Sequence, residues 1–166
     1  TVVTLGKGFD DVELIEEEDG PRLKCMAASL LSRIAKKALA ESLAGFEFAS
    51  GIPGSIGGAV FMNAGAYGGE IIDVLESVEL LSPNSEGSWE LKTVPAEELE
   101  LAYRHSRLQE TRELVVSATL KLQRGDKAEI EEKLAELTKK RTSKQPLEFP
   151  SAGSFFKRPD GYFAAK

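Results

Sequence analysis

The sequence predicts an α+β protein, in which short strands and amphipathic helices follow one another without an internal repeat. Three observations support this class: paired β-like runs near the start, two segments with apolar residues at helical spacing, and an alternating apolar run near residue 120. The chain has 166 residues, of which 42% are hydrophobic and 29% charged. It is therefore long enough to bury the core of one domain, or of one domain and part of a second.

The first elements are predicted to be a hairpin followed by a helix. Val12–Ile15 and Arg22–Met26 are β-like, and the charged stretch between them ends in a Gly-Pro turn signal. From Ser29 onward, apolar residues recur at helical spacing, with Ser29 as the expected N-cap and Gly45 just beyond the end. The opening run Val2–Leu5 is also strand-like, so a further strand is expected there.

The second half is predicted to hold three strands and a closing helix. The strand-like runs are Val74–Leu81, Trp89–Val94 and Leu114–Leu122, the last with apolar and polar residues in alternation. Asp126, with Glu129 three residues later, has the pattern of a helix start, and the basic end of this segment suits the negative end of a helix dipole. The resulting order of elements favours an α+β chain over a doubly wound sheet.

Composition argues against several classes of function. The net charge of −6 and the pI near 5.0 argue against a nucleic-acid partner, because phosphate binding needs clustered Lys and Arg. Cys25 and His105 are the single cysteine and histidine, so neither a disulfide framework nor the usual zinc site is expected, and we predict no metal. No apolar run reaches ~18 residues and no signal peptide is evident, so we expect no membrane partner and a cytoplasmic location.

A glycine-rich segment is the sharpest local feature. Seven glycines fall within nineteen residues, in Ser50–Ala59 and the following Met62–Gly69. Without a Cβ the backbone can approach a ligand closely, and exposed N–H groups could hold a pyrophosphate. The spacing matches neither the dinucleotide fingerprint nor a Walker loop, and Pro53 has no N–H to donate. A set of tight turns without any ligand remains the alternative.

Two further segments carry reactive side chains. Tyr103–Arg107 combines two cations, an aromatic hydroxyl and a titratable ring, which suits an anionic substrate. A surface ion pair at Arg104 and a solvated loop at His105 are the alternatives. Pro150–Lys157 places Ser154 between a glycine and two aromatic residues, where it could also simply satisfy a turn.

Taken in chain order, these segments resemble one family. Gly45–Ala59, Asn63–Gly68, Tyr103–Ser106 and Ser151–Lys157 are similar to the motifs of UDP-N-acetylenolpyruvoylglucosamine reductases, the MurB family. Four ordered motifs over nearly the whole chain are far more specific than any one of them. The short connection from Ser106 to Leu114 resembles the more compact of the family's two classes.

The resemblance implies part of the FAD-binding fold of the PCMH type, followed by most of an α+β substrate-binding domain. Residues 1–100 would form the second subdomain of the FAD-binding domain, and residues 101–166 the substrate-binding part. In this family another flavin subdomain precedes the first of these, and a catalytic glutamate follows the second. We therefore expect a chain that is truncated at both ends and inactive alone.

The resemblance also implies a reaction. FAD would take a hydride from NADPH and pass it to UDP-N-acetylglucosamine enolpyruvate, which gives UDP-N-acetylmuramate for peptidoglycan synthesis. Arg104 would stabilise the enolate, since a guanidinium stays protonated and can bind a carboxylate at two points. Ser154 would donate the proton. Substrate contacts are implied for Tyr103, Lys144 and Lys157, whereas Arg158 stands where the family often has asparagine.

The residues implied for FAD binding lie in the glycine-rich segment and the turn after it. They are Ser50, Gly51, Ile52, Pro53, Gly54, Ser55, Gly57, Gly58, Ala59, Asn63, Gly65, Ala66, Tyr67 and Gly68. These positions are expectations from the resemblance.

Two other classes of function stay open. One is a different FAD oxidoreductase of the same broad fold, although Tyr103–Arg104 with Gly153–Ser154 argues against it. The other is a domain without catalytic activity that binds a nucleotide sugar or a protein partner. Substrate-dependent oxidation of NADPH and bound flavin absorbance would separate these three possibilities.

Overall fold

A five-stranded antiparallel sheet forms the centre of the protein. The computed structural model describes residues 4–145, and its sheet has the strand order β1-β2-β8-β6-β7. The predicted α+β class is confirmed by this mixture of strands and helices. The strands are β1 (Val12–Glu17), β2 (Gly20–Met26), β6 (Leu75–Pro83), β7 (Trp89–Pro95) and β8 (Leu114–Lys121).

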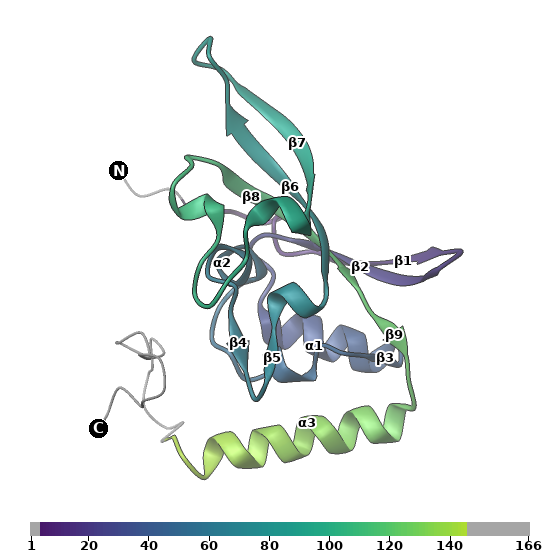
Figure 1. Ribbon diagram of the computed structural model, residues 1–166. Helices are drawn as coiled ribbons and strands as arrows, with labels where there is room; N and C mark the ends of the chain where they lie inside the picture. Colours follow the sequence, from purple (N-terminus) through teal and green to yellow (C-terminus); the bar gives the residue numbers. More distant parts are fainter. Residues whose placement is uncertain (1–3, 146–166) are drawn as a thin grey trace.

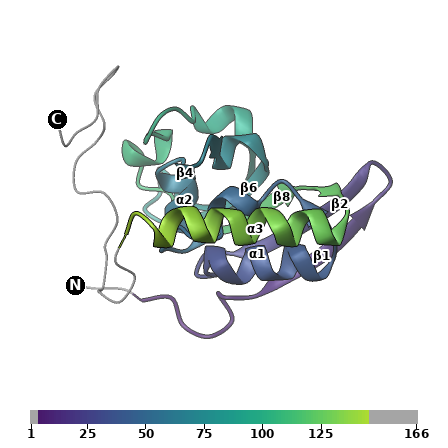
Figure 2. The same cartoon turned by 90° about the horizontal axis from the view of Figure 1, so that it is seen from below.

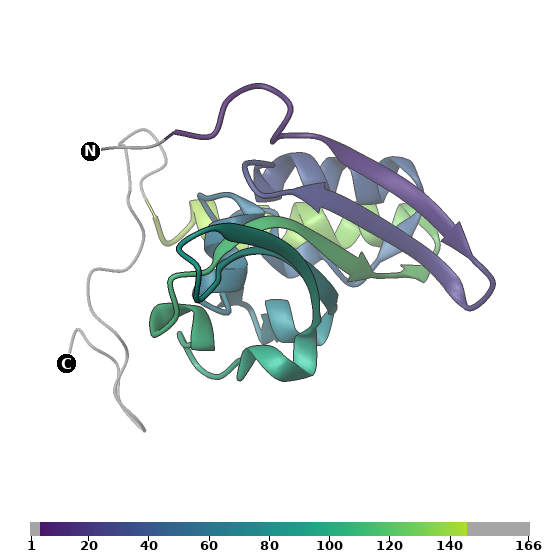
Figure 3. The ribbon, with the colours of Figure 1, turned by 90° about the horizontal axis from the view of Figure 1, so that it is seen from above.

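Helices lie along one side of this sheet. α1 (Leu31–Ala40) and α3 (Lys127–Thr142) run side by side beneath the strands, with α1 closer to them (Figure 1, Figure 2). Seen from above, the strands lie in front of both helices (Figure 3). The short α2 (Ile56–Phe61) packs against β8. The glycine-rich segment, which contains α2, therefore lies against the sheet.

The strand β8 joins the two hairpins. Ala118 at its centre pairs with Cys25 of β2 on one side and with Val78 of β6 on the other, and all three side chains are buried. Burial raises the pKa of the Cys25 thiol to about 12, as expected for a core residue rather than a reactive one. Residues 114–121 therefore belong to the same sheet as the strands before residue 100. The predicted domain boundary near residue 100 stays a prediction.

The helix α1 forms where its apolar spacing predicts, but its start differs. Leu31, Ile34, Ala35 and Ala38 are buried along one face. The predicted N-cap at Ser29 is wrong: the capping position is the next residue, and the Ser29 hydroxyl donates to the carbonyl oxygen of the distant Asp11 at 2.9 Å. The Ser29 hydroxyl therefore binds a backbone group distant in sequence instead of capping the helix, as the local pattern predicted.

The predicted cap of α3 is confirmed. The Asp126 carboxylate accepts hydrogen bonds from the backbone N–H groups of Ala128 and Glu129 at 2.8 and 3.1 Å, which satisfies two of the unpaired groups of the first turn. At the other end, a Cβ on Gly51 would lie 2.9 Å from Arg141 Cδ. The end of α3 thus contacts the start of the glycine-rich segment.

Several smaller elements were not predicted. They are α2, the ribbon of β3 (Leu43–Ala44) with β9 (Gln123–Arg124), and the hairpin of β4 (Gly65–Ala66) with β5 (Gly69–Glu70). The expected first strand is not seen in the described part, since Thr4 and Leu5 lie outside any strand. Within residues 4–145, no helix is long and apolar enough to cross a membrane.

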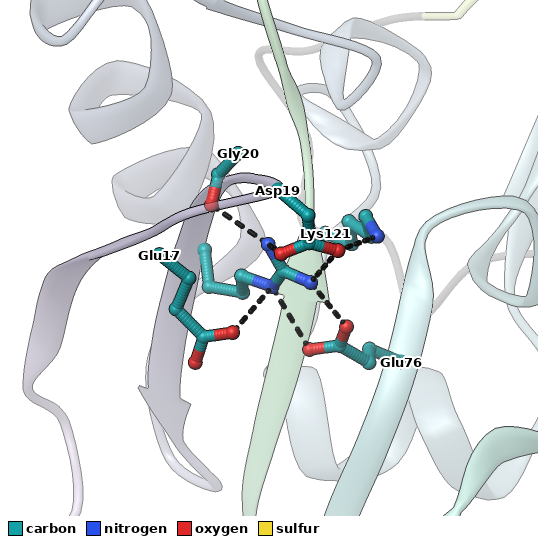
Figure 4. Close-up of polar contacts among 6 residues, drawn as sticks. Glu17, Asp19, Gly20, Glu76 and Lys121 are labelled. Atoms are coloured by element: carbon teal, nitrogen blue, oxygen red, sulfur yellow. Dashed lines mark hydrogen bonds and ion pairs between the residues drawn. The ribbon is translucent and has the colours of Figure 1, made fainter.

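An ion-pair network ties the first hairpin to β6 and β8. The Arg22 side chain is only 3% exposed, and its guanidinium lies 2.7 Å from Glu76 and 2.5 Å from Asp19. Lys121 on β8 contacts the same Asp19 carboxylate at 2.5 Å. Figure 4 shows these carboxylates, together with Glu17, arranged around the guanidinium. Because Arg22 pairs with carboxylates of the hairpin and of β6, and Lys121 of β8 pairs with Asp19, the network links the hairpin to both strands.

Candidate active site

Backbone hydrogen bonds hold the glycine-rich segment against the loop that follows β2. The N–H groups of Ile56 and Gly57 donate to the carbonyl oxygens of Ser29 and Ala27, both at 2.9 Å. In return, the Leu31 N–H donates to the carbonyl oxygen of Gly54 at 3.0 Å. The segment is therefore fixed by the fold on one side, although glycines make it a poor helix former by itself.

Some of the glycines are required by packing within the chain. A Cβ at Gly65 would lie 2.6 Å from the carbonyl oxygen of Gly69, and a Cβ at Gly69 would lie 2.7 Å from the Phe48 ring. A Cβ at Gly57 would lie 3.1 Å from Ala27. Tight packing explains these three positions without any ligand.

Two other glycines face open space. A Cβ at Gly54 would meet nothing within 4 Å, and one at Gly58 would approach no atom closer than 3.9 Å. Both residues are exposed, and neither has a positive φ. Packing and backbone conformation therefore leave their lack of a side chain unexplained, whereas close approach by another molecule would explain it.

The Tyr103–Arg104 pair lies at the tip of a tight turn. The backbone groups of Ala102 and His105 on either side exchange hydrogen bonds at 3.1 and 3.0 Å. Arg104 has a φ of +55°, a left-handed conformation that costs a residue with a side chain roughly 1–2 kcal/mol. Backbone strain of this kind is enriched at functional sites, which agrees with the role expected for this turn.

The side chain of Arg104 reaches back to the glycine-rich segment. Its Nη1 and Nη2 donate hydrogen bonds to the carbonyl oxygens of Asn63 at 3.2 Å and Gly65 at 2.9 Å. The guanidinium also lies over the Tyr103 ring, 4.9 Å from its centroid, where cation–π attraction favours it. The structure thus brings the predicted catalytic arginine together with the predicted cofactor segment. The Arg104 side chain is 30% exposed, and these two hydrogen bonds use only part of the donor capacity of its guanidinium.

Two side chains fasten the turn to the end of α2. The buried Ser106 hydroxyl donates to the carbonyl oxygen of Phe61 at 2.7 Å. The Gln109 amide donates to the same oxygen at 3.3 Å and to the Arg104 carbonyl oxygen at 3.1 Å. Sequence reasoning missed Gln109, because no local pattern links it to residues more than forty positions earlier.

The side chain of Asn63 is engaged within the chain. Its side chain is fully buried, and its amide hydrogen-bonds to Glu70, Ile72 and Ala102. Its φ of +40° is one that asparagine tolerates better than most residues. The side chain therefore connects parts of the chain, and the expected contact with FAD stays a prediction. Glu70 was also missed, although it follows the glycine-rich segment directly.

The remaining predicted residues are spread more widely. Tyr67 is exposed at the turn between β4 and β5, next to Gly68. Lys144 is exposed just beyond α3, and its N–H donates to the Arg141 carbonyl oxygen at 3.1 Å. Ser154 and Lys157 lie outside the described residues. The roles assigned to all these side chains stay predictions.

Comparison with known protein families identifies the family to which the chain belongs. A family described as "FAD binding domain" matches residues 1–88, which is more than half of the sequence. The chain belongs to this FAD-binding domain family. The expected FAD-binding fold is thereby confirmed.

The resemblance to the reductase family is confirmed as well. UDP-N-acetylenolpyruvoylglucosamine reductases of Alkaliphilus oremlandii and Agathobacter rectalis are 54% and 49% identical to this FAD-binding protein, in each case over 99% of it. The matched regions are 52% and 54% of those relatives, so the chain spans about half the length of the curated relatives it matches.

Solved structures agree with this family. The crystal structure of UDP-N-acetylenolpyruvylglucosamine reductase from Thermus caldophilus superimposes with a TM-score of 0.71 at 35% identity, covering 85% of this chain and 50% of that one. A solvent-stable cholesterol oxidase matches with a TM-score of 0.58 at 14% identity, covering 71% of this chain and 24% of that one. The second likeness shows a shared fold only.

Proposed function

We propose that this FAD-binding chain is part of an NADPH-dependent reductase that converts UDP-N-acetylglucosamine enolpyruvate to UDP-N-acetylmuramate in peptidoglycan synthesis. The observation that carries the proposal is the hydrogen bonding of Arg104 to the carbonyl oxygens of Asn63 and Gly65. These bonds attach a partly exposed cation to the segment expected to contact the cofactor. The curated relatives named as this reductase supply the substrate class.

The open glycines fit the cofactor. FAD, when bound, would accept a hydride from NADPH and pass it to the substrate. Gly54 and Gly58 would hold FAD, because no atom of the chain fills the space where their side chains would stand. Tyr67 is exposed in the turn that follows, and the resemblance implies that it contacts FAD as well. Close approach of backbone to a flat or charged ligand is what residues without a Cβ permit.

Arg104 would meet the charge that develops on the substrate. Addition of a hydride to the distal enolpyruvyl carbon leaves an electron pair on the carbon next to the carboxylate. A guanidinium already held by two backbone carbonyls can bind that carboxylate without reorganising, so it stabilises the enolate more than the ground state. A proton from Ser154 would then form a second C–H bond, at the carbon that carries the electron pair, a role that rests on the resemblance.

The other assignments belong to the same proposal. Tyr103, Lys144 and Lys157 would contact the UDP-sugar, and the cytoplasmic location is unchanged from the sequence prediction. For the domain boundary, the sheet favours a position after β8 rather than near residue 100, because β8 pairs with both β2 and β6.

One experiment tests the proposed function. A complete reductase containing this segment is purified, its flavin absorbance is recorded, and NADPH oxidation is followed with and without the enolpyruvyl sugar. We expect bound flavin and oxidation that depends on the sugar. Sugar-independent oxidation would favour another flavin oxidoreductase, and absence of flavin would favour a domain that only binds.

A further inference from the structure

Asn63 connects the two halves of the candidate site. Its Nδ2 donates to the Ala102 carbonyl oxygen at 3.1 Å, in the turn that carries Arg104, and to Glu70 Oε2 at 2.9 Å. Its Oδ1 accepts a hydrogen bond from the Ile72 N–H at 3.0 Å. Because a buried amide must satisfy both donor and acceptor groups, these contacts hold the turn against the segment 70–72.

Glu70 faces Arg104 with its other oxygen. Glu70 Oε1 lies 3.7 Å from Arg104 Nη1, within ion-pair range but beyond hydrogen-bonding distance. The hydrogen bond from Asn63 holds the opposite oxygen, Oε2. The carboxylate therefore attracts the guanidinium without occupying the N–H donors that a substrate carboxylate would need.

Asn63 also acts through its backbone. Its carbonyl oxygen accepts the hydrogen bond from Arg104 Nη1, so one residue fixes both the backbone of the turn and the guanidinium. Asn63 makes this bond from a left-handed backbone conformation, with a φ of +40°. Asparagine suits the position because it tolerates this conformation and supplies the amide.

We propose that Asn63 and Glu70 are positioning residues for Arg104: together they hold its guanidinium in one orientation toward the carboxylate of the substrate. The inference rests on the proposed function, since it presumes that Arg104 acts on the enolpyruvyl group. An arginine side chain otherwise samples many rotamers, and small errors in placement are costly for a group that must match a developing charge.

A purely structural role would give a different result. If the two residues only staple the loops together, a change in Glu70 would affect cofactor binding and both half-reactions alike. If they act through Arg104, the step that consumes the enolpyruvyl sugar alone is slowed. The effect of changing Glu70 must then also disappear once Arg104 has been changed.

Glu70→Gln is the variant of choice because the Glu70 side chain is 34% exposed and glutamine has nearly the same shape as glutamate. Changes at the buried Asn63, in contrast, risk unfolding the chain. In the complete reductase, Glu70→Gln, Arg104→Lys and the double variant are compared by stopped-flow absorbance. The probes are NADPH for flavin reduction and the enolpyruvyl sugar for reoxidation. We expect Glu70→Gln to slow reoxidation by roughly tenfold with unchanged reduction, and the double variant to be no slower than Arg104→Lys.

A matched control comes from the neighbouring ion pair. Glu113 Oε2 lies 3.4 Å from Arg107 Nη2, so Glu113→Gln removes a carboxylate that faces a different arginine, and reoxidation should stay unchanged. Normal reoxidation in Glu70→Gln beside a slow Arg104→Lys would overturn the positioning role alone, as would multiplicative effects in the double variant. Normal reoxidation in Arg104→Lys would show that charge alone suffices there and would overturn the positioning role, whereas absence of sugar-dependent reoxidation in the unmodified reductase would overturn the proposed function.

Discussion

The guanidinium of Arg104 donates a hydrogen bond to the carbonyl oxygen of Gly65 at 2.9 Å, across 39 positions of sequence. This bond places the cationic turn directly on the glycine-rich segment. Gly65 in turn packs so closely on Gly69 that a Cβ there would lie 2.6 Å from a carbonyl oxygen. The position of the candidate catalytic group thus depends on backbone packing in the candidate cofactor segment.

Arg104→Lys should not restore function, although it keeps the positive charge. Lysine has a single ammonium group, which cannot bind two backbone carbonyls and a carboxylate with the planar geometry of a guanidinium. In the complete reductase we expect flavin reoxidation to slow by ~10², about 3 kcal/mol of lost stabilisation. Arg112→Lys, at an exposed position of the same loop, is the control. A near-normal rate in the Arg104 variant would show that charge alone suffices.

Gly58→Ala should stabilise the fold and weaken the cofactor site. Gly58 lies within α2, where a Cβ would meet no atom closer than 3.9 Å, so alanine should raise the free energy of unfolding by about 0.5–1 kcal/mol. The same methyl group would stand where FAD is proposed to approach. Urea unfolding of this chain and flavin titration of the complete reductase measure the two effects.

Gly57→Ala is the matched control for this pair of measurements. The added Cβ would lie 3.1 Å from the Ala27 carbonyl oxygen, so this neighbouring substitution should destabilise the fold. If Gly58→Ala left flavin affinity unchanged, no ligand would approach the backbone at that position.

The strands could be predicted because each follows a local pattern. The runs at residues 74–81, 89–94 and 114–122 all became strands within two residues of the expected ends. Their order in the sheet could not be predicted, since the pairing of Ala118 with both Cys25 and Val78 joins distant parts of the chain. Periodicity reports which face of a strand is buried, not which strand lies beside it.

The site was predicted in part. Arg104 and the glycine-rich segment were expected from the resemblance, and the structure brings them together. Helix α2 was not expected, because glycine disfavours helices and the backbone bonds to Ser29 and Ala27 are tertiary contacts. Glu70 was missed for a related reason: its carboxylate faces Arg104, which is distant in sequence.

Acid should weaken the fold through carboxylates that pair with cations. Hydrogen bonds from Arg22 and Lys121 lower the pKa of Asp19, and hydrogen bonds from Ser117 and Lys24 lower the pKa of Glu79. A depressed folded-state pKa gives stability that is present above the unfolded-state pKa, about 4 for these groups, and is lost as the pH falls through the folded-state value. We therefore expect the urea midpoint to hold from neutral pH to about pH 5 and to fall below about pH 4.

Asp19→Asn tests this assignment. The variant should be less stable than the parent chain at neutral pH, and its stability should fall less steeply in acid because one of the paired carboxylates is gone. Glu18→Gln removes a carboxylate from the same turn for which the described residues show no ion pair, so it should follow the parent. If the urea midpoints of Asp19→Asn and of the parent fell in parallel as the pH is lowered, groups other than Asp19 would cause the acid sensitivity.

Ser154→Ala should separate the two half-reactions of the complete reductase. Ser154 lies outside the described residues, and its role as proton donor rests on the resemblance. Its loss should leave flavin reduction by NADPH nearly unchanged and slow reoxidation by the enolpyruvyl sugar by ~10² or more. Stopped-flow absorbance measures both. Equal slowing of the two steps would mean that Ser154 supports the fold or the cofactor instead.

The 166-residue chain should fold alone yet bind FAD weakly and turn over no substrate. Its sheet has a complete buried centre at Ala118, Cys25 and Val78, so a cooperative urea transition is expected without flavin. The chain nevertheless spans about half the length of its curated relatives, and Gly54 and Gly58 offer the cofactor a single open surface. Catalytic groups that act as a unit lose activity together when some are missing. A yellow preparation with stoichiometric flavin and NADPH-dependent turnover, at an intact mass of 18.0 kDa, would instead require a complete site within these residues.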